Sequence, residues 1–388
     1  MTLKELLEKA LAVNASDLHV GAGSPPQIRV DGNLKTLEGY PALTAEDTLR
    51  LCCEPISAEQ REKIKTAREL DFSFGIGERC RIRANIFWQQ ASMAGAFRQI
   101  PFRIPTIEEL GLPDILIHLT ERTRGLVLVT GPTGSGKSTT LAALLDRINE
   151  QRHDHIITIE DPIEYLYVQK NCVIAQREVG SDTDSFSLAL KYALRQDPDV
   201  ILVGEMRDLE TIQNAVTAAE TGHLVFATLH TNTAVQSIDR IIDVFPPHQQ
   251  PQVRTQLSFI LEAVVTQQLM PRNGGGRVLA QEIMVPNAAI RNLIRENKTH
   301  QIYASMQVGQ DKSGMLTMNQ ALANLVSHQV IPFEEGVRRS TDRDEFMHLM
   351  EKFRTMGPAA LGRAVQPGGA AAADDRMKTL GRQPAQKG

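Results

Sequence analysis

The sequence is poor in aromatic side chains, in cysteine and in long apolar runs. Aromatic residues make up 5% of the 388 residues and include one tryptophan, so the base-stacking surface of a protein that tracks single-stranded nucleic acid is not expected. The net charge of −4 gives no general attraction to a polyanion. No uninterrupted apolar run approaches the roughly 18 residues of a membrane span. We therefore expect no nucleic-acid partner and no direct membrane span.

The four cysteines, Cys52, Cys53, Cys80 and Cys172, show no metal-type spacing, and the adjacent pair is a poor basis for a disulfide framework. They indicate reduced thiols in a cytoplasmic protein. Lysines and glutamates stand among the leucines of residues 1–13, which predicts an amphipathic helix and argues against a signal peptide.

The first 100 residues predict a small α+β domain with one covered sheet face. Apolar and polar residues alternate across residues 25–37, and the turn signal Asp31-Gly32 within them predicts a hairpin. In residues 79–90, arginines alternate with apolar residues, so each kind is expected on its own face of a strand. The proline-containing stretch 101–113 predicts a linker.

From about residue 120 the pattern changes to strand, loop and helix in alternation, which predicts an α/β domain with a mostly parallel sheet. A helical stripe of leucine and isoleucine follows the first apolar run, and Asp208 is expected to cap a helix that stops at Gly222. Residues 361–388 hold too few large apolar side chains to fold and predict a disordered tail. The predicted buried strands are 125–131, 155–161, 199–205 and 223–231.

Residues 131–138, GPTGSGKS, match the P-loop pattern and lie between a predicted strand and a predicted helix, as that motif requires. The glycines let backbone N–H groups approach phosphate oxygens, Lys137 reaches the β- and γ-phosphates, and Ser138 offers a hydroxyl to Mg²⁺. A glycine-rich turn without chemical use is the alternative. The residues expected to bind ATP are Gly131, Pro132, Thr133, Gly134, Ser135, Gly136, Lys137, Ser138 and Thr139.

The apolar run 200–203 ends in Gly204 and Glu205, where a metal-holding aspartate is more usual. In a RecA-type sheet we expect this strand beside the P-loop strand, with its carboxyl end toward the γ-phosphate. Glu205, one residue past the strand end, would then orient or deprotonate the attacking water, and Gly204 would allow close backbone approach. A solvated acid at a strand end is the alternative.

Acidic and histidine residues follow the neighbouring strands. Glu160, Asp161 and Glu164 around one strand end indicate a bound cation, with Glu160 as its carboxylate ligand, although an ordinary acidic loop is the alternative. His230 is a candidate to sense the γ-phosphate by hydrogen bonding, and His223 is a candidate to support it. A histidine at a strand edge is more often structural, so the residues alone leave both roles open.

Four motifs occur in order: the P-loop, the acidic TIEDPIEY, the strand-ending RQDPDVILVGEMRDLETI and the histidine-bearing AAETGHLVFATLHTN. Together they resemble the secretion ATPases that drive type II secretion and type IV pili. AIRNLIRENK, residues 289–298, resembles the signature of the type IV pilus retraction ATPases of the PilT family, and ASDLHV and PPQIRVDG resemble the N-terminal domain of that family. The resemblance covers about residues 1–350.

The resemblance implies a homohexamer that binds ATP and Mg²⁺ between neighbouring subunits. Each subunit would have a PAS-like α+β N-terminal domain with a linker, residues 1–104, and a RecA-like P-loop ATPase domain, residues 105–360. The implied partners are an inner-membrane pilus platform protein of the PilC type and a paralogous retraction ATPase, and the implied location is the cytoplasm at the inner-membrane base of the pilus machine. The resemblance also assigns the catalytic residues: Glu205 as the catalytic glutamate, Glu160 and Glu164 as acidic-box residues, and His223 and His230 as histidine-box residues.

An interfacial ATPase also needs positive charge near the γ-phosphate, an effect on the order of 10³–10⁵ in rate for an arginine finger. A surface cation or a structural ion pair is the alternative for each arginine, and the sequence does not say which one acts on a neighbour's nucleotide. The candidates are Arg29, Arg81, Arg83, Arg124, Arg195, Arg207 and Arg240.

Residues 289–298 predict a helix that Asn287 caps, with an apolar stripe on one side and Arg291, Arg295 and Lys298 on the polar side. Without the resemblance this is a core-packing helix with a solvated basic face. The resemblance instead implies a retraction-specific role separate from hydrolysis. The segment consists of Ala289, Ile290, Arg291, Asn292, Leu293, Ile294, Arg295, Glu296, Asn297 and Lys298.

Residues and resemblance together favour a hexameric motor ATPase that drives pilus retraction and twitching motility. The nearest alternative is an accessory retraction ATPase of the PilU type, which has the same architecture. A pilus-extension or type II secretion ATPase is less well supported, because those proteins carry a four-cysteine zinc module. A nucleic-acid translocase and a non-hydrolysing nucleotide switch are the alternatives from other classes.

Overall fold

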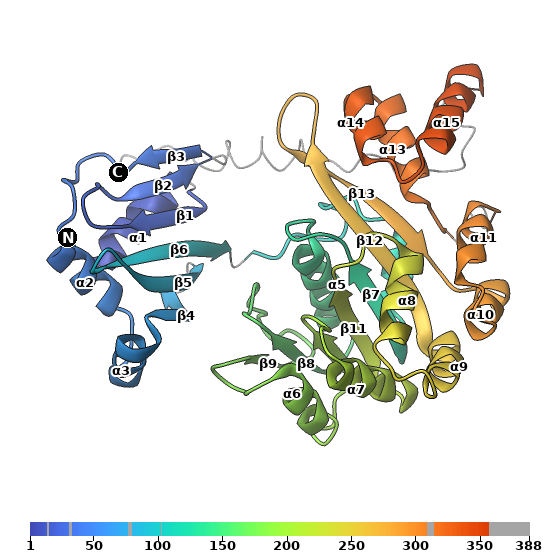
Figure 1. Ribbon diagram of the computed structural model, residues 1–388, viewed down its shortest axis with the longest axis horizontal. Helices are drawn as coiled ribbons and strands as arrows, with labels where there is room; N and C mark the ends of the chain where they lie inside the picture. The colour runs from blue at the N-terminus through green and yellow to red at the C-terminus, as the bar shows by residue number, and fades with distance from the viewer. Residues whose placement is uncertain (14, 31–32, 77–79, 102, 309–313, 357–388) are drawn as a thin grey trace, which may run out of the picture. The chain divides into compact units, whose positions relative to one another are not determined.

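The computed structural model describes residues 1–13, 15–30, 33–76, 80–101, 103–308 and 314–356 (Figure 1). The chain divides into an N-terminal unit, Met1–Arg103 together with Pro162–Tyr167, and a second unit formed by Ile104–Asp161 and the chain from Val168 onward. The tail predicted at 361–388 lies outside the described residues. Among the described residues, no helix has the length and apolar character that a bilayer span requires.

The N-terminal unit contains a six-stranded antiparallel sheet in the order β3-β2-β1-β6-β5-β4. Val30 pairs with Asn33, so β2 and β3 form the predicted hairpin around a turn that lies outside the described residues. Each of the three helices begins at a capping box, in which the side chain before the helix and the third helical side chain satisfy each other's backbone N–H groups. The strands are β1 (Asp17–Val20), β2 (Gln27–Val30), β3 (Asn33–Thr36), β4 (Glu69–Ile76), β5 (Cys80–Gln89) and β6 (Ser92–Pro101), and the helices are α1 (Leu3–Ala12), α2 (Ala45–Cys53) and α3 (Ala58–Ala67).

One face of this sheet is buried. Ile82, Ala84 and Ile86 of β5 are fully buried and share a hydrophobic core with side chains of the three helices. Arg81 and Arg83 alternate with them and are partly exposed, because successive side chains of a strand point to opposite faces. The predicted α+β pattern with one covered sheet face is therefore confirmed.

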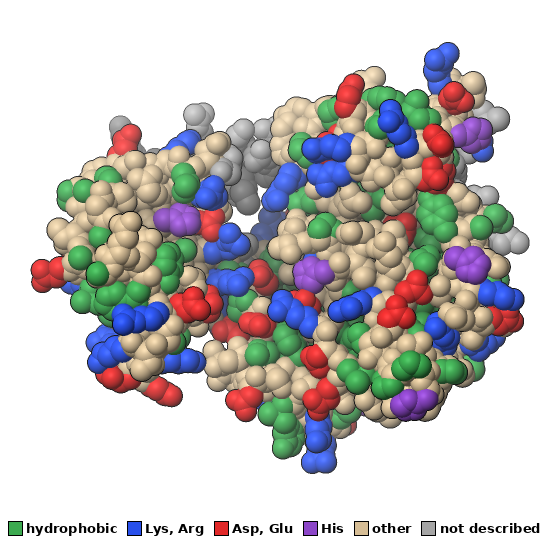
Figure 2. Space-filling view, viewed as in Figure 1, with side chains coloured by type: hydrophobic (Ala, Val, Ile, Leu, Met, Phe, Trp, Pro, Cys, Tyr) green, Lys and Arg blue, Asp and Glu red, His purple; other side chains and the backbone are tan. Residues whose placement is uncertain are grey.

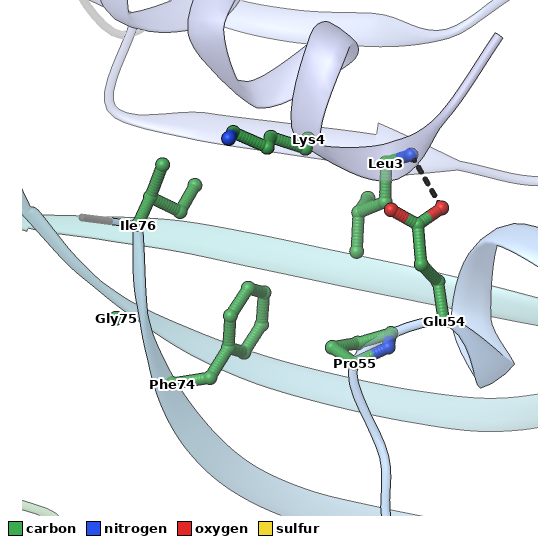
Figure 3. Close-up of a pocket in the computed structure, with 7 residues that line it drawn as sticks. All are labelled: Leu3, Lys4, Glu54, Pro55, Phe74, Gly75 and Ile76. Carbon is green, nitrogen blue, oxygen red and sulfur yellow. Dashed lines mark hydrogen bonds between the residues drawn. The ribbon is translucent and has the colours of Figure 1, made fainter.

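A mostly apolar hollow of about 250 Å³ lies in the N-terminal unit, where α1 begins beside the end of β4 (Figure 3). The backbone N–H of Leu3 donates to Glu54 Oε2 at 2.9 Å across its rim. The lining residues are Leu3, Lys4, Glu54, Pro55, Phe74, Gly75 and Ile76, and none of them belongs to the predicted nucleotide site.

The second unit contains a seven-stranded sheet in the order β13-β12-β7-β11-β10-β8-β9. Every neighbouring pair is parallel except β12 with β13, which confirms the mostly parallel α/β sheet predicted from the sequence. The strands are β7 (Gly125–Thr130), β8 (His155–Glu160), β9 (Val173–Glu178), β10 (Val200–Val203), β11 (Leu224–Leu229), β12 (Leu261–Pro271) and β13 (Arg277–Met284).

The expectation that β10 lies beside the P-loop strand β7 is wrong, because β11 lies between them and pairs with both. A uniformly apolar strand carries no pattern that identifies its neighbour, so the sequence could not reveal this order. β10 also ends at Val203, which places Glu205 two residues past the strand end and not one. The carboxyl ends of the parallel strands still meet at one edge of the sheet.

Helices cover both faces of this sheet. All of β7 is buried, and the predicted stripe of α5 (Leu141, Leu144, Leu145 and Ile148) is buried too. The Asp208 side chain accepts a hydrogen bond from Thr211 N at 2.9 Å, as expected of a helix cap. The helices that pack here are α4 (Asp114–Thr120), α5 (Lys137–Gln151), α6 (Phe186–Ala193), α7 (Leu209–Glu220), α8 (Ala234–Asp243) and α9 (Gln250–Ile260).

The last three helices, α13 (Met318–Ser327), α14 (Phe333–Arg339) and α15 (Arg343–Met356), form a separate cluster on the β12–β13 hairpin (Figure 1). Phe346 and Leu322 are fully buried in this cluster and lie in one core with Met270 and Ala280 of the hairpin. On the face shown in Figure 2, acidic and basic side chains are interspersed over the surface. The helices from this point are α10 (Ala288–Arg295), the 3₁₀ turn η1 (Thr299–Gln301), α11 (Ile302–Val308), α13 (Met318–Ser327), α14 (Phe333–Arg339) and α15 (Arg343–Met356).

A buried glutamate joins this cluster to the sheet helices. Glu282 of β13 is 1% exposed, and its carboxylate accepts hydrogen bonds from Ala234 N at 2.7 Å and Met318 N at 3.4 Å. These are the first residues of α8 and α13, so one carboxylate satisfies N–H groups of two helix starts. Burial raises the pKa of Glu282 above its ordinary value of 4.5, although the two backbone hydrogen bonds act against burial.

We expect the free energy of unfolding to depend on pH because the pKa of Glu282 is raised in the folded protein. The contribution of Glu282 is fully present below its unfolded-state pKa, near 4.5, and is lost as the pH rises through the higher folded-state value. Glu282→Gln removes the titration, so the unfolding midpoint of the wild type relative to this variant should rise as the pH is lowered from 7 toward 4.5. Thermal unfolding across that range measures the difference, with Glu62→Gln on the exposed surface of α3 as the control. A difference that does not vary with pH would contradict the assignment.

Candidate nucleotide and catalytic site

The P-loop joins the end of β7 to the start of α5. Gly131 has φ +136°, and a Cβ at this position would lie 2.4 Å from Gln267 O, so no side chain fits there. Gly136 has φ +92° and immediately precedes α5, in a backbone region that favours glycine. The backbone N–H groups of the loop and the first turn of α5 therefore lie together at the carboxyl edge of the sheet, the arrangement that binds phosphate in this motif.

Lys137, the first residue of α5, folds back over the loop. Its Nζ donates to Gly131 O at 2.9 Å and to Pro132 O at 3.1 Å. Burial lowers the pKa of Lys137, and the negative charge of Glu205 acts in the opposite direction. The ammonium group thus stands within the loop where phosphate oxygens would lie, in electrostatic contact with the candidate catalytic glutamate.

β12 supports the P-loop from its other side, which the sequence analysis missed. Thr266 Oγ1 lies 2.8 Å from Thr130 Oγ1, and Gln267 Nε2 donates to Thr140 Oγ1 of α5 at 2.7 Å. All four side chains are almost completely buried. The available signal was the polar TQQ in the middle of the otherwise apolar run LEAVVTQQLM.

Glu205 stands at the same edge, in a short loop after β10. Its Oε1 accepts hydrogen bonds from Arg207 Nε at 2.6 Å and from His230 Nε2 at 3.1 Å. Burial tends to raise the pKa of Glu205, but the hydrogen bond from Arg207 and the charge of His230 outweigh it, so the pKa lies below the usual value. The structure therefore brings a carboxylate that is ionised at neutral pH to the edge where the P-loop begins.

Gly204 allows the close backbone approach that the sequence suggested, although the partner is β8. Gly204 N donates to Ile159 O at 2.8 Å, and a Cβ at this position would lie 3.0 Å from the same oxygen. On the other side, Thr228 Oγ1 donates to Gly204 O at 2.5 Å. Sequence reasoning did not single out Thr228, because threonine is an ordinary strand residue.

Glu160 and Glu164, two of the predicted acidic residues, fall in different units of the chain. Glu160 ends β8 and is 8% exposed, and its Oε1 accepts hydrogen bonds from Thr158 Oγ1 at 2.7 Å and Gln176 Nε2 at 3.4 Å. Glu164 belongs to the segment that groups with the N-terminal unit, where it lies 3.6 Å from Arg83 Nη1. Within the described part of the chain, no three His, Cys, Asp or Glu side chains form a group that could hold a metal. Glu160 thus lies at the carboxyl edge of the parallel sheet, and Glu164 pairs within the N-terminal unit.

The two histidines lie at opposite ends of β11. His230 follows the carboxyl end and contacts Glu205, whereas His223 precedes the amino end and its Nδ1 lies 2.9 Å from Ala218 O. The six residues of β11 span about 20 Å. A full strand length therefore separates His223 from His230 within one chain, and the supporting role of His223 stays a prediction.

Among the described residues of the second unit, Arg207 is the one of four candidate arginines that contacts the predicted catalytic glutamate. Arg81 donates to Ser73 Oγ, and Arg29 Nε lies 3.8 Å from Asp17 Oδ2, both within the N-terminal sheet. The others are Arg83, paired with Glu164, and the exposed Arg124 at the amino end of β7, Arg195 between α6 and β10, and Arg240 on α8.

Residues 289–298 form most of α10 and the turn after it. The Asn287 side chain accepts from Ile290 N at 3.0 Å, as predicted for the cap, and Ile290 and Ile294 are fully buried. The alternative of a solvated basic face does not hold for Arg291, whose Nη1 donates to Ser258 O at 2.7 Å at the end of α9. Carbonyls at a helix end attract a cation, which explains why this side chain turns inward.

The family model of type II/IV secretion system proteins matches residues 96–274. The chain is 48% identical over 346 residues to the type IV pilus retraction ATPase PilT of Pseudomonas aeruginosa, covering 89% of this chain and 100% of that protein. It is 40% identical over 356 residues to the type IV pilus ATPase PilU of the same organism, covering 91% and 92%. A crystal structure of the pilus retraction motor PilT with bound ADP matches with a TM-score of 0.85 and 52% identity, over 90% of this chain and 99% of that chain.

Replacing Lys137 tests the phosphate site. Lys137→Ala should weaken the binding of ADP by about 10- to 100-fold, because a hydrogen bond from a charged group is worth about 1.5–3 kcal/mol. Titration calorimetry measures the change. Lys170→Ala is the matched control, because Lys170 has the same charge but pairs with Asp146 and Glu150. Equal binding by the wild type and the Lys137 variant would contradict the assignment.

Proposed function

The chain belongs to the PilT family of ATPases, and we propose that it hydrolyses ATP to drive the retraction of type IV pili. The observation that carries this proposal is that the P-loop with Lys137 and the loop with Glu205 follow different strands but lie at the same carboxyl edge of one parallel sheet. A phosphate-binding lysine beside an ionised carboxylate suits nucleotide hydrolysis, whereas a nucleotide switch needs only the first of the two.

In this proposal ATP binds with its phosphates on the backbone N–H groups of residues 131–139. Lys137 would exchange its contacts with Gly131 O and Pro132 O for phosphate oxygens, and it stands within the loop already. The bound ADP of the solved PilT relative supports a nucleotide at this site.

We assign Mg²⁺ to Ser138 and Glu160. Mg²⁺ keeps several waters and usually takes one or two carboxylates together with substrate phosphates, so it does not need a preformed cluster of protein ligands. Ser138 is the second residue of α5, directly after the lysine, and Glu160 ends a strand at the same edge. The ion would neutralise phosphate charge there.

Glu205 would act on the attacking water. Both observed hydrogen bonds use Oε1, and we assign Oε2 to the water. Because the pKa of Glu205 lies below its usual value, the side chain is a carboxylate throughout the neutral range and can orient the water as an acceptor. Arg207 and His230 would hold the carboxylate in place.

The assembly and partners follow from the family. We propose a homohexamer that acts on an inner-membrane pilus platform protein of the PilC type, from the cytoplasm at the base of the pilus machine. We propose that one or more of the other candidate arginines supplies positive charge to the nucleotide of a neighbouring subunit. The higher identity to PilT than to PilU, 48% against 40%, favours the main retraction ATPase over the accessory one.

Glu205→Gln tests the catalytic assignment. The amide keeps the shape of the side chain but loses its charge and basicity, so kcat for ATP should fall by about 10²- to 10⁴-fold while ADP binding is retained. Phosphate release and calorimetry measure the two quantities. Glu210→Gln on the exposed first turn of α7 is the matched control and should keep full turnover. Undiminished hydrolysis by the Glu205 variant would overturn the assignment.

Deletion in the source bacterium tests the cellular role. Without retraction, pili that continue to be extended should accumulate, so we expect hyperpiliated cells without twitching motility, scored by microscopy and a motility assay. Restoration by the wild-type gene but not by the Glu205→Gln gene would tie the phenotype to hydrolysis. Loss of surface pili would point to an extension ATPase instead.

A further inference from the structure

The backbone that carries Glu205 is held by hydrogen bonds on both sides. Gly204 N donates to Ile159 O of β8 at 2.8 Å. On the opposite side, Gly204 O accepts from Thr228 Oγ1 at 2.5 Å, and Met206 N donates to Thr228 O at 3.1 Å. Two of these three hydrogen bonds involve one residue, Thr228 of β11, which donates one and accepts the other.

Thr228 stands where the regular pairing of β10 with β11 ends. The last paired residues are Val203 and Ala227, so the backbone ladder stops just before the segment that carries Glu205. Beyond that point the Thr228 hydroxyl supplies a hydrogen bond to Gly204 that the ladder no longer provides. Thr228 is 5% exposed, and it is the one side chain with a hydroxyl in the strand LVFATL.

His230, which follows two residues later, contacts the carboxylate itself. β11 therefore fixes Glu205 twice: Thr228 holds the backbone, and His230 holds the side chain. A valine at position 228 would have nearly the same shape and strand preference but could not donate to Gly204 O. The hydroxyl thus has a function that packing does not explain.

We propose that Thr228 is a positioning residue for hydrolysis, which sets the place of the Glu205 carboxylate relative to the nucleotide through the hydrogen bond to Gly204. This proposal rests on the catalytic role proposed above for Glu205. Since a displacement of about 1 Å of a catalytic group lowers rates by on the order of 10²-fold, loss of this hydrogen bond should appear in kcat and not in nucleotide affinity.

The experiment compares Thr228→Val and Thr228→Ser in the full chain. We expect kcat for ATP to fall by about 10- to 100-fold in the valine variant, with the Kd for ADP within about twofold of the wild type. The serine variant keeps the hydroxyl and should restore most of the turnover. Thr217→Val, which removes a hydroxyl from the exposed side of α7, is the matched control and should leave both values unchanged.

A double variant separates positioning from a general structural effect. If Thr228 acts through Glu205, Thr228→Val should cause little further loss of kcat in a Glu205→Gln background, because residues that act as a unit are not additive. The proposal would be overturned if Thr228→Val kept wild-type turnover or lost ADP affinity in parallel with kcat. It would also be overturned if Thr228→Ser did not restore turnover, or if Thr228→Val lowered kcat as much in the Glu205→Gln background as in the wild type. Full activity of Glu205→Gln alone would instead overturn the proposed role of Glu205.

Discussion

The parallel pairing of β11 with both β7 and β10 is the constraint on which the candidate site depends. Leu224 pairs with Gly125 on one side and with Val200 on the other, and β10 continues the register to β8. Because these strands run in the same direction, their carboxyl ends lie at one edge of the sheet. The P-loop, Glu205 and His230 each follow one of these ends and therefore lie at that edge. A slip of β11 by one residue would turn its side chains to the opposite face and remove His230 from Glu205. Backbone hydrogen bonds thus fix distances between groups far apart in the sequence.

Different interactions set the ionisation of the two charged side chains at this edge, Lys137 and Glu205. Burial lowers the pKa of Lys137, and the same effect opposes ionisation of Glu205 until Arg207 and His230 outweigh it. An incoming phosphate favours the charged form of the lysine and repels the carboxylate. The contacts of Arg207 and His230 with Glu205 offset that repulsion. The site can therefore keep an acceptor for water close to an anionic substrate.

The P-loop and Glu205 could be predicted because each motif combines a local sequence with a strand–loop context. The order of the strands could not, since an apolar run such as 200–203 does not encode its neighbour. The separation of His223 from His230 follows from their places at opposite ends of one strand, which the predicted strand 223–231 already implies. Thr228 was missed because its role lies in one hydrogen bond to another strand end, which leaves no pattern in the sequence.

Glu282 connects the chain that follows β11 to the C-terminal helices. The loop after β11 leads into α8, whose first N–H binds Glu282, and the same carboxylate binds the first N–H of α13. Separating the two helix starts would leave a buried polar group without its partner, which costs about 1–3 kcal/mol. The loop that carries His230 is therefore joined, through the start of α8 and Glu282, to the packing of the C-terminal cluster.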